Sequence, residues 1–262
     1  MRALLDGDEF IYKACVSKVE EVNWDTGESE SVLPTLRQAK RKLVDTVDYW
    51  VRTTEADQMV FVVSPPERGL FRRGLFPGYK SGRNEKPEIY SELEAWAIDR
   101  WDGKWYPGLE ADDTMGVLAG KGTIIVSSDK DMKTVPGRLA IPKSGKFMTI
   151  TQDRADHWWM MQTLMGDSTD GFAGCIGCGP KGAEEVLLNG TNMAEWWPEV
   201  ERRFELPKTP KYRDFPQSAK DALTQAQLSR ILRPNEYDPK GGGVFYRIGK
   251  HDISFNAHTL AR

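Results

Sequence analysis

The chain has 262 residues, a net charge of −3, and 39% hydrophobic residues. This length suits one large domain or two small ones, and the apolar fraction is sufficient for a buried core. No apolar run of about 18 residues is present, which argues against a transmembrane helix, and the amino terminus MRALLDGDEF reaches an acid too early for a secretory signal. We therefore expect a cytoplasmic protein without a membrane partner.

The cysteines are sparse and odd in number, which suits a reducing compartment better than a disulfide scaffold. Cys175 and Cys178 form a CxxC pair, but the other thiol and the three histidines are scattered along the chain. Because a structural zinc site usually needs four ligands, packing of two small residues in a tight turn is the favoured interpretation of this pair.

The first half of the chain alternates strand and helix patterns. Residues 2–5, 59–63 and 123–127 are continuous β-favouring runs, typical of strands buried on both faces of a parallel sheet. Apolar residues recur at helical spacing over 36–51, and a second amphipathic helix begins at Ile89. Between them lies a basic segment punctuated by Gly and Pro, FRRGLFPGYKSGRNEKPE (71–88).

From about residue 153 the pattern changes to helix on helix. The segments ADHWWMMQTLM, PKGAEEVLL, MAEWWPEVERRF and SAKDALTQAQLSRIL each predict a helix, and DPKGGG precedes a short apolar tail, VFYRIG. We predict a compact α/β unit over 1–152, which includes a basic loop or arch over 71–105, and a helical unit over 153–262.

Acidic residues gather in four places, each after a predicted strand or beside a predicted helix. Taken singly, such acids are often helix caps or turn residues. Acids at the carboxyl ends of parallel strands, however, share the edge of the sheet where ligands bind. The four clusters are Asp6 with Asp8, Glu110 with Asp112 and Asp113, Asp129 with Asp131, and Asp167 with Asp170.

Together these clusters would bring nine carboxylates to one cleft. Like charges raise each other's pKa, so the cluster requires cations, and hard divalent ions such as Mg²⁺ or Mn²⁺ prefer oxygen ligands. The nine acids carry more negative charge than the whole chain, whose net charge is −3, so the remainder of the chain has a net positive charge. A basic remainder is expected of a protein that binds nucleic acid. Two ions about 3.5–4 Å apart suit in-line attack on a phosphodiester.

Five glycines follow Asp170 within twelve residues, in GFAGCIGCGPKG. Gly174, Gly177 and Gly179 predict a turn between helices that brings backbone N–H groups close to a phosphate. Pro180 suits the first turn of the next helix, whose amino terminus favours an anion. A P-loop is excluded because the segment lacks the GxxxxGK[ST] pattern.

The segment GDSTDGFAGCIGCGPKGA resembles the GD-x-x-D and helix–hairpin–helix signature of the flap endonuclease and 5′→3′ exonuclease superfamily. LLDGD, FPGYKSGR, EADDTMGVLA and SSDKDMKTVPG are similar to the other motifs of that superfamily, in the same order. A finer similarity, to the 5′→3′ exonucleases of short-tailed bacteriophages, is carried by ADHWW (155–159) and ILRPNEY (231–237). The resemblance spans nearly the whole chain.

This resemblance implies a PIN-like α/β core with a mostly parallel sheet, two Mg²⁺ ions, and a carboxyl-terminal unit that grips duplex DNA through a helix–hairpin–helix motif. Lys80 and Arg83 match the residues that steer and polarise the scissile phosphate. Tyr79 would stack on a base or pack in a turn, and Arg72 would contact a second phosphate or remain a solvated loop residue. The DNA-binding residues would further include Gly174, Gly177, Gly179 and Lys181. The implied metal ligands are Asp6, Glu110, Asp112, Asp113, Asp129, Asp131, Asp167 and Asp170.

The implied activity is removal of nucleotides from duplex DNA with a free 5′ end or a flap, and from RNA–DNA hybrids. It would serve phage DNA replication and host-DNA degradation in the bacterial cytoplasm, with a replication polymerase as partner. Mn²⁺ would substitute for Mg²⁺, and a K⁺ ion would bind at the hairpin.

The chain departs from the family pattern after the strand at 59–63. Relatives usually carry another aspartate there, whereas this chain has SPPERGLF, in which Glu67 is the nearest acid. Asp8 is not carried over as a ligand, because many relatives lack an acid at that position.

Two rival functions are a haloacid-dehalogenase-type phosphatase and a non-catalytic module that binds DNA structures. The phosphatase explains the Asp-x-Asp start but leaves Glu110–Asp113 and YKSGR without a role. The binding module has no need for clustered acids, which weaken DNA binding unless metals occupy them.

Overall fold

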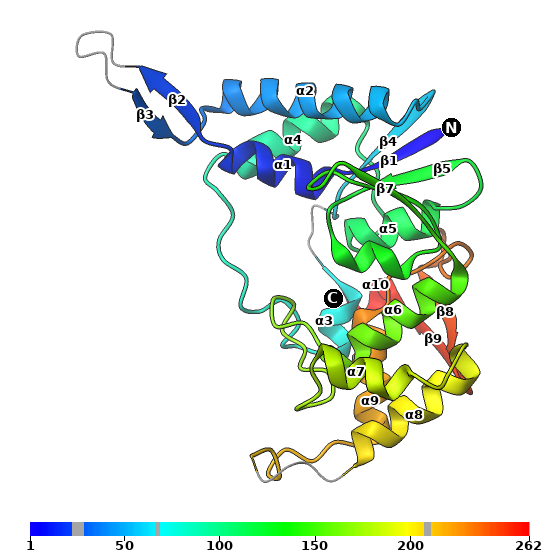
Figure 1. Cartoon of the computed structure of the whole chain (residues 1–262). Helices are drawn as coiled ribbons and strands as arrows, with labels where there is room; N and C mark the ends of the chain where they lie inside the picture. The colour runs from blue at the N-terminus through cyan, green and yellow to red at the C-terminus, as the bar shows by residue number, and fades with distance from the viewer. Residues whose placement is uncertain (23–28, 66–68, 207–210, 262) are drawn as a thin grey trace.

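The computed structural model describes residues 1–22, 29–65, 69–206 and 211–261 (Figure 1). Its centre is a five-stranded sheet in the order β4 (Gln58–Val62), β1 (Arg2–Asp6), β5 (Thr123–Val126), β6 (Gly137–Ile141) and β7 (Lys146–Ile150). The first four strands are parallel, and β7 pairs antiparallel with β6. The predicted α/β class with a mostly parallel sheet is confirmed.

Helices cover both faces of this sheet, because alternate side chains of each strand point to opposite faces. Leu5 and Phe61 pack with helices α1 (Gly7–Val16), α2 (Leu36–Thr53) and α4 (Tyr90–Trp101). On the other face, Leu4 and Ile125 pack with α5 (Ala111–Leu118), the 3₁₀ helix η1 (Lys130–Thr134) and the start of α6 (Gln152–Met165). The prediction that these apolar strands are buried on both faces is therefore correct.

A second core forms around α6, α7 (Pro180–Leu187), α8 (Met193–Glu205) and α9 (Ala219–Ser229). It also contains a hairpin of β8 (Gly243–Ile248) and β9 (His251–Asn256), followed by α10 (Ala257–Leu260). The segment expected to be an apolar tail is thus β8. Its side chains alternate in burial, since Val244, Tyr246 and Ile248 are buried while Phe245 is exposed.

Helix α3 (Phe71–Leu75) belongs to the second core, although residues 71–105 were predicted to form a loop or arch of the first unit. Phe71 packs in that core, and Gly74 lies directly against the backbone of Leu260 in α10. Residues 76–89 then lead to α4, which packs on the sheet. This basic loop therefore runs along one side of the molecule between the two units (Figure 1).

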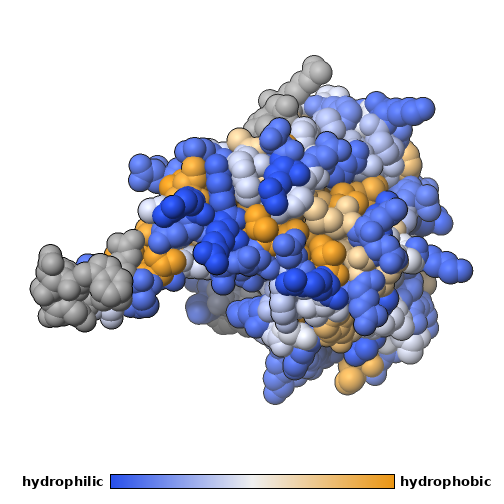
Figure 2. All heavy atoms as spheres, turned by 90° about the horizontal axis from the view of Figure 1, so that it is seen from above, coloured by the Kyte–Doolittle hydropathy of each residue, from blue (hydrophilic) through white to orange (hydrophobic). Residues whose placement is uncertain are grey.

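A small hairpin of β2 (Val19–Val22) and β3 (Ser29–Val32), absent from the sequence-based prediction, projects beyond α1 and α2 (Figure 1). The face seen from above is mainly hydrophilic, with apolar patches between its charged side chains (Figure 2). Within the described ranges, no helix is both long and apolar enough to cross a bilayer.

Candidate active site

The first acidic position is the end of β1, where the strand turns directly into α1. Asp6 is the N-cap of α1 and accepts a hydrogen bond from the Glu9 amide at 3.0 Å. Ser127, which directly follows β5, donates its hydroxyl to the other Asp6 oxygen at 2.6 Å. This contact forms because β1 and β5 are parallel neighbours and end at the same edge of the sheet.

The second acidic position is the start of α5, which packs against the sheet. Asp112 has no hydrogen-bond or ion-pair partner among the described residues, although it interacts electrostatically with Asp6 and Asp129. Asp113 is fully buried, and it accepts hydrogen bonds from the Arg72 guanidinium and from the Leu232 amide. Both Asp113 oxygens are therefore engaged in tying α5 to α3 and to the segment after α9, and we leave Asp113 out of the proposed ligand set.

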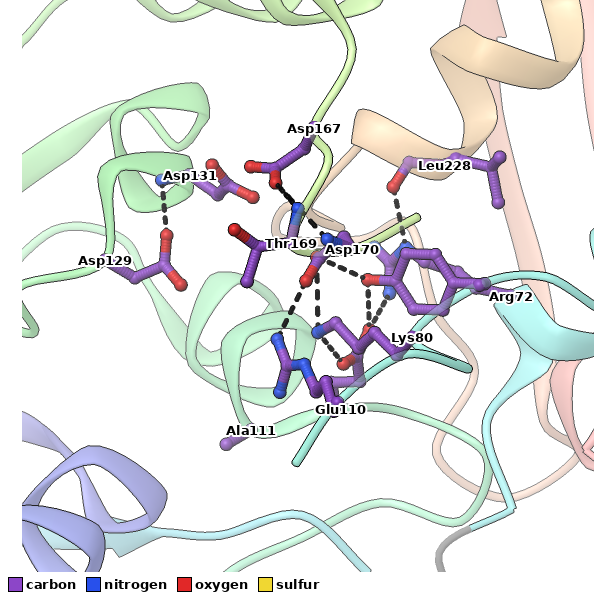
Figure 3. Close-up of polar contacts among 12 residues, drawn as sticks. Arg72, Lys80, Glu110, Ala111, Asp129, Asp131, Asp167, Thr169, Asp170 and Leu228 are labelled. Atoms are coloured by element: carbon purple, nitrogen blue, oxygen red, sulfur yellow. Dashed lines mark hydrogen bonds and ion pairs between the residues drawn. The ribbon is translucent and has the colours of Figure 1, made fainter. Parts of the chain in front are cut away.

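The third and fourth positions face one another across η1 and the turn after α6 (Figure 3). Asp129 caps η1 by accepting from the Asp131 amide at 2.7 Å, and Asp131 accepts from the Gln162 side chain of α6. Asp167 holds its turn by accepting from the amides of Thr169 and Asp170 at 2.7 and 3.2 Å. Such aspartate-centred turns are common, but here they fix the carboxylates of two segments beside each other.

The loop 76–89 brings basic side chains to these acids. Lys80 is buried and contacts Glu110 of α5, and its Nζ lies 3.4 Å from an Asp170 oxygen. Arg83, which is half exposed, donates to Asp170 at 2.8 Å. Lys80 takes a left-handed backbone conformation with φ of 55°, and its amide donates to the Asp170 carbonyl at 2.8 Å.

Gly171 permits this close approach. A Cβ atom at Gly171 would lie 2.6 Å from the Gly78 carbonyl oxygen, and its φ is +79°. Any other residue would clash with the loop and adopt an unfavourable backbone conformation. The glycine at this position therefore serves the contact between the loop and the acidic turn.

Arg72 does not lie where a phosphate can reach it, which corrects its predicted role. Its side chain is 1% exposed, and it donates to Glu110 at 3.0 Å, to the Leu228 carbonyl at 3.0 Å and to Asp113. Tyr79 has the packed arrangement that was predicted as the alternative to base stacking. Tyr79 is buried and its hydroxyl lies 2.9 Å from Glu110 and 3.1 Å from Asp170.

Several of these acids are buried and repelled by neighbouring acids, and their negative charge is not compensated. Burial, reinforced by Glu9, raises the pKa of Asp6 to about 8. Burial and the neighbouring Asp129 and Asp170 raise the pKa of Asp131 to about 7. Burial, together with Asp129 and Asp6, holds the pKa of Asp112 well above its ordinary range. These carboxylates would remain ionised only with a nearby cation.

Glu110 behaves differently because protein cations already neutralise it. Although burial opposes ionisation, Lys80 and Arg72 lower the pKa of Glu110 to about 2. Lys130 likewise lowers the pKa of Asp167 against the effect of burial, with a contact of 2.6 Å between Lys130 Nζ and an Asp167 oxygen. The cluster therefore has a charge-compensated part and an uncompensated part.

The donor set fits a hard divalent cation. Among the described residues, no three Asp, Glu, His or Cys side chains are arranged to enclose an ion as they stand. Glu110, Asp167 and Asp170 are paired with lysine and arginine instead. The uncompensated carboxylates nevertheless supply the oxygen ligands that Mg²⁺ and Mn²⁺ prefer, at a place where added positive charge relieves repulsion.

The glycine-rich segment between α6 and α7 divides into a buried part and an exposed part. Gly174 is buried, its amide donates to Gln225 at 2.7 Å, and its carbonyl accepts from Gln217 at 2.8 Å. It has no backbone group left for DNA, so its predicted role is corrected. Gly177, Gly179 and Lys181 are exposed, and Pro180 opens α7 as predicted. Cys175 and Cys178, within this segment, are both buried.

Three polar residues of the site were missed in the sequence: Ser127, Lys130 and Gln162. Ser127 precedes the third cluster and Lys130 lies between its two acids, so proximity to a predicted ligand was an available signal. Gln162 lies three residues beyond the ADHWW block (155–159), but its contact with Asp131 follows only from how α6 packs on η1.

Two other positions, Asp8 and His157, have surroundings of their own. Asp8 accepts from the Ser64 amide at 3.2 Å, whereas Asp6 accepts from Ser127. Glu67 lies outside the described residues. His157 lines a cavity of about 450 Å³ with Trp158 and Trp196, and the residues lining that cavity include none of the four acidic clusters.

Comparison of the chain with known proteins agrees with the sheet, its acidic edge and its basic loop. Residues 1–155 match the 5′-3′ exonuclease, N-terminal resolvase-like domain. Because this match covers more than half of the chain, the protein belongs to the 5′-3′ exonuclease family, a family of nucleases.

Named relatives support the same conclusion. The chain is 27% identical over 270 residues to the exonuclease of Escherichia phage T7, covering 90% of this chain and 89% of the relative. It is 28% identical over 277 residues to the exodeoxyribonuclease of Enterobacteria phage T3, covering 90% and 88%. The predicted superfamily and its phage branch are thus confirmed.

The fold also has a solved counterpart. The bacteriophage T5 D15 flap endonuclease, crystallised as a pseudo-enzyme–product complex with DNA and metal ions, matches with a TM-score of 0.64 and 14% identity. The match covers 88% of this chain and 89% of that chain. At this identity the likeness concerns the fold, and it confirms the predicted PIN-like arrangement.

Proposed function

We propose that this protein is a divalent-metal-dependent 5′ nuclease that hydrolyses phosphodiester bonds at free 5′ ends or flaps of duplex DNA. The observation that carries the proposal is the convergence of carboxylates from four distant segments at one edge of the sheet, beside a basic loop. Figure 3 shows three of these segments, with Glu110, Asp129, Asp131, Asp167 and Asp170. Family membership and the T5 complex with DNA and metal ions support it.

The proposed ligands are the acids that remain after Asp113 is set aside. Mg²⁺ is the proposed ion and Mn²⁺ a substitute, since both prefer oxygen donors. Such ions lower the pKa of bound water and stabilise the leaving oxygen of an in-line displacement. The ligand set is Asp6, Glu110, Asp112, Asp129, Asp131, Asp167 and Asp170.

In this proposal Lys80 and Arg83 orient the scissile phosphate. Lys80 lies against Glu110 and Asp170, and Arg83 lies against Asp170, so a phosphate bound over these acids would meet both cations. Arg83 is the half-exposed member and offers a planar donor group to two phosphate oxygens. Lys80, which is buried, supplies a fixed positive charge where charge develops in the transition state.

The duplex would bind at the exposed glycine turn before α7. Gly177 and Gly179 lie immediately before α7, whose amino terminus favours a phosphate, and Lys181 adds a positive charge there. Five points remain predictions from the family resemblance. They are the helix–hairpin–helix contact with DNA, a K⁺ ion at the turn, cleavage of RNA–DNA hybrids, action in the bacterial cytoplasm and a replication polymerase partner.

One assay tests the proposal. A duplex labelled at either the 5′ or the 3′ end is incubated with Mg²⁺, with Ca²⁺ and with a chelator. We expect early release of the 5′ label with Mg²⁺ only. Removal of a terminal phosphate without strand shortening would instead identify a phosphatase, and retention of intact DNA without any products would identify a binding module.

A further inference from the structure

Lys130 is placed between two acids and reaches a third. It is the first residue of η1, flanked by Asp129 and Asp131, and its Nζ lies 2.6 Å from Oδ2 of Asp167 in the turn after α6. The Asp167 side chain is 8% exposed, whereas that of Lys130 is 54% exposed. The ammonium group thus covers a buried carboxylate from the solvent side.

The two oxygens of Asp167 have separate partners. Oδ1 accepts the amides of Thr169 and Asp170, which fixes the turn, and Oδ2 pairs with Lys130. The charge of Lys130 also acts on Asp129 and Asp131. Lys130 therefore occupies the oxygen that a divalent ion needs from Asp167, and its charge opposes the approach of that ion to all three acids.

The lysine side chain has a way to leave while its backbone stays in place. The Lys130 carbonyl accepts a hydrogen bond from Trp158 Nε1 of α6 at 3.0 Å, which anchors η1. The exposed, flexible stem can then turn its ammonium group toward solvent or toward a phosphate, which is a strong partner for such a group.

We propose that Lys130 holds Asp167 in an ion pair until substrate arrives, and that a DNA phosphate draws the ammonium away and releases Asp167 to the metal. This inference rests on the proposed function, because it assumes metal binding by these acids. It makes metal binding and DNA binding mutually favourable, and such coupling must be reciprocal. The protein would bind its second ion weakly until DNA is present.

The test is calorimetric titration of the full chain with Mn²⁺, for wild type, Lys130→Met and Lys130→Gln, each without DNA. Removing a competing cation should tighten binding at one site by about twofold to fivefold, the effect of an ion pair of this exposure on a binding constant. Lys133→Met is the matched control, because Lys133 is on the same 3₁₀ helix but lies over the Trp158 ring, 5.0 Å from its centroid. Its Mn²⁺ affinity should equal that of wild type.

A second titration adds a duplex whose 5′-terminal linkages are phosphorothioates, which slow hydrolysis. Wild type should bind Mn²⁺ more tightly with this duplex than without it, and Lys130→Met should show a smaller difference. Equal or weaker Mn²⁺ binding by both Lys130 variants would overturn the inference while leaving the proposed function intact. If wild type binds no Mn²⁺, or if Asp129→Asn leaves binding unchanged, the proposed function fails instead, and this inference fails with it.

Discussion

One carboxylate oxygen of Asp129 has a local structural role, and the other oxygen has none. One carboxylate oxygen caps η1, and the other has no hydrogen-bond partner among the described residues. Asparagine is as good an N-cap as aspartate, so Asp129→Asn should retain η1 and lose only the charge. We expect cleavage to fall by more than about hundredfold, beyond the usual effect of outer-shell partners of a metal, while duplex affinity stays within about tenfold.

Cleavage kinetics and a filter-binding assay on the same labelled duplex measure both quantities. Asp153→Asn, an exposed acid in the first turn of α6, is the control and should behave like wild type. Loss of the fold in Asp129→Asn, seen as a lost cooperative unfolding transition, would contradict the catalytic assignment.

Arg72 shows how a basic residue in a basic loop can serve the core. It is buried against Asp113 and Glu110, and it also binds the carbonyls of Leu228 and Arg230. Arg72→Met would leave the Asp113 charge buried without its partner, which typically costs about 3–5 kcal/mol of unfolding free energy. Urea denaturation measures this quantity.

Arg83→Met is the comparison for Arg72, since Arg83 is half exposed and pairs with Asp170 alone. Its loss should cost less than about 1 kcal/mol, as for exposed ion pairs. If the two variants lose equal stability, the structural role of Arg72 is wrong.

At the scale of elements, the glycine turn before α7 carries the proposed duplex contact. Gly177 has a φ of +81°, and a Cβ there would lie 3.1 Å from the Tyr212 ring. A β-branched residue in this conformation costs on the order of 1–3 kcal/mol and would displace the turn. Gly177→Val should therefore weaken binding of long duplexes and spare cleavage of very short ones.

Gly145→Val is the matched control for this prediction. Gly145 lies in the turn between β6 and β7 with a φ of +65° and open space around its Cβ position, so the same strain arises away from α7. Affinity measured by fluorescence anisotropy on a long and a short duplex separates the cases. Equal weakening by both variants would show that lost stability, rather than the turn, is responsible.

Elements with strong periodicity were predictable from the sequence. Helix α2 follows from its helical spacing, and β1, β4 and β5 follow from short β-favouring runs. The β8–β9 hairpin was missed because its first strand follows a glycine run and was interpreted as a tail, although Val244, Tyr246 and Ile248 alternate with exposed residues. Hairpin β2–β3 gave less signal, since the described part of β3 is mostly exposed.

At the scale of the whole molecule, the buried acids link stability to pH and to metal. The pKa of Asp6 is raised to about 8 and that of Asp131 to about 7, so the folded metal-free protein holds protons that the unfolded chain releases near pH 4. Stability therefore decreases as pH rises from about 4 to about 8. The pKa values of Glu110 and Asp167 are lowered, so these two groups change the stability only at more acidic pH.

We expect the chelated protein to lose on the order of 3–4 kcal/mol of unfolding free energy between pH 6 and pH 8. Mg²⁺ binds the ionised acids, so it should stabilise the protein more at pH 8 than at pH 6. Thermal unfolding with chelator and with Mg²⁺ at both pH values tests this. An equal Mg²⁺ effect at the two pH values would mean that these acids do not receive the ion.

The sequence by itself determined the acidic clusters, the apolar strands that end beside them and the family motifs, because these depend on neighbours along the chain. Only the tertiary structure decided which acids are free to bind metal. Asp112 lacks a hydrogen-bond partner in the described chain, whereas Asp113, one residue later, is bound by Arg72 and by Leu232. That difference arises from contacts between α3, α5 and the segment after α9, and no local pattern encodes which of two adjacent carboxylates meets a buried guanidinium.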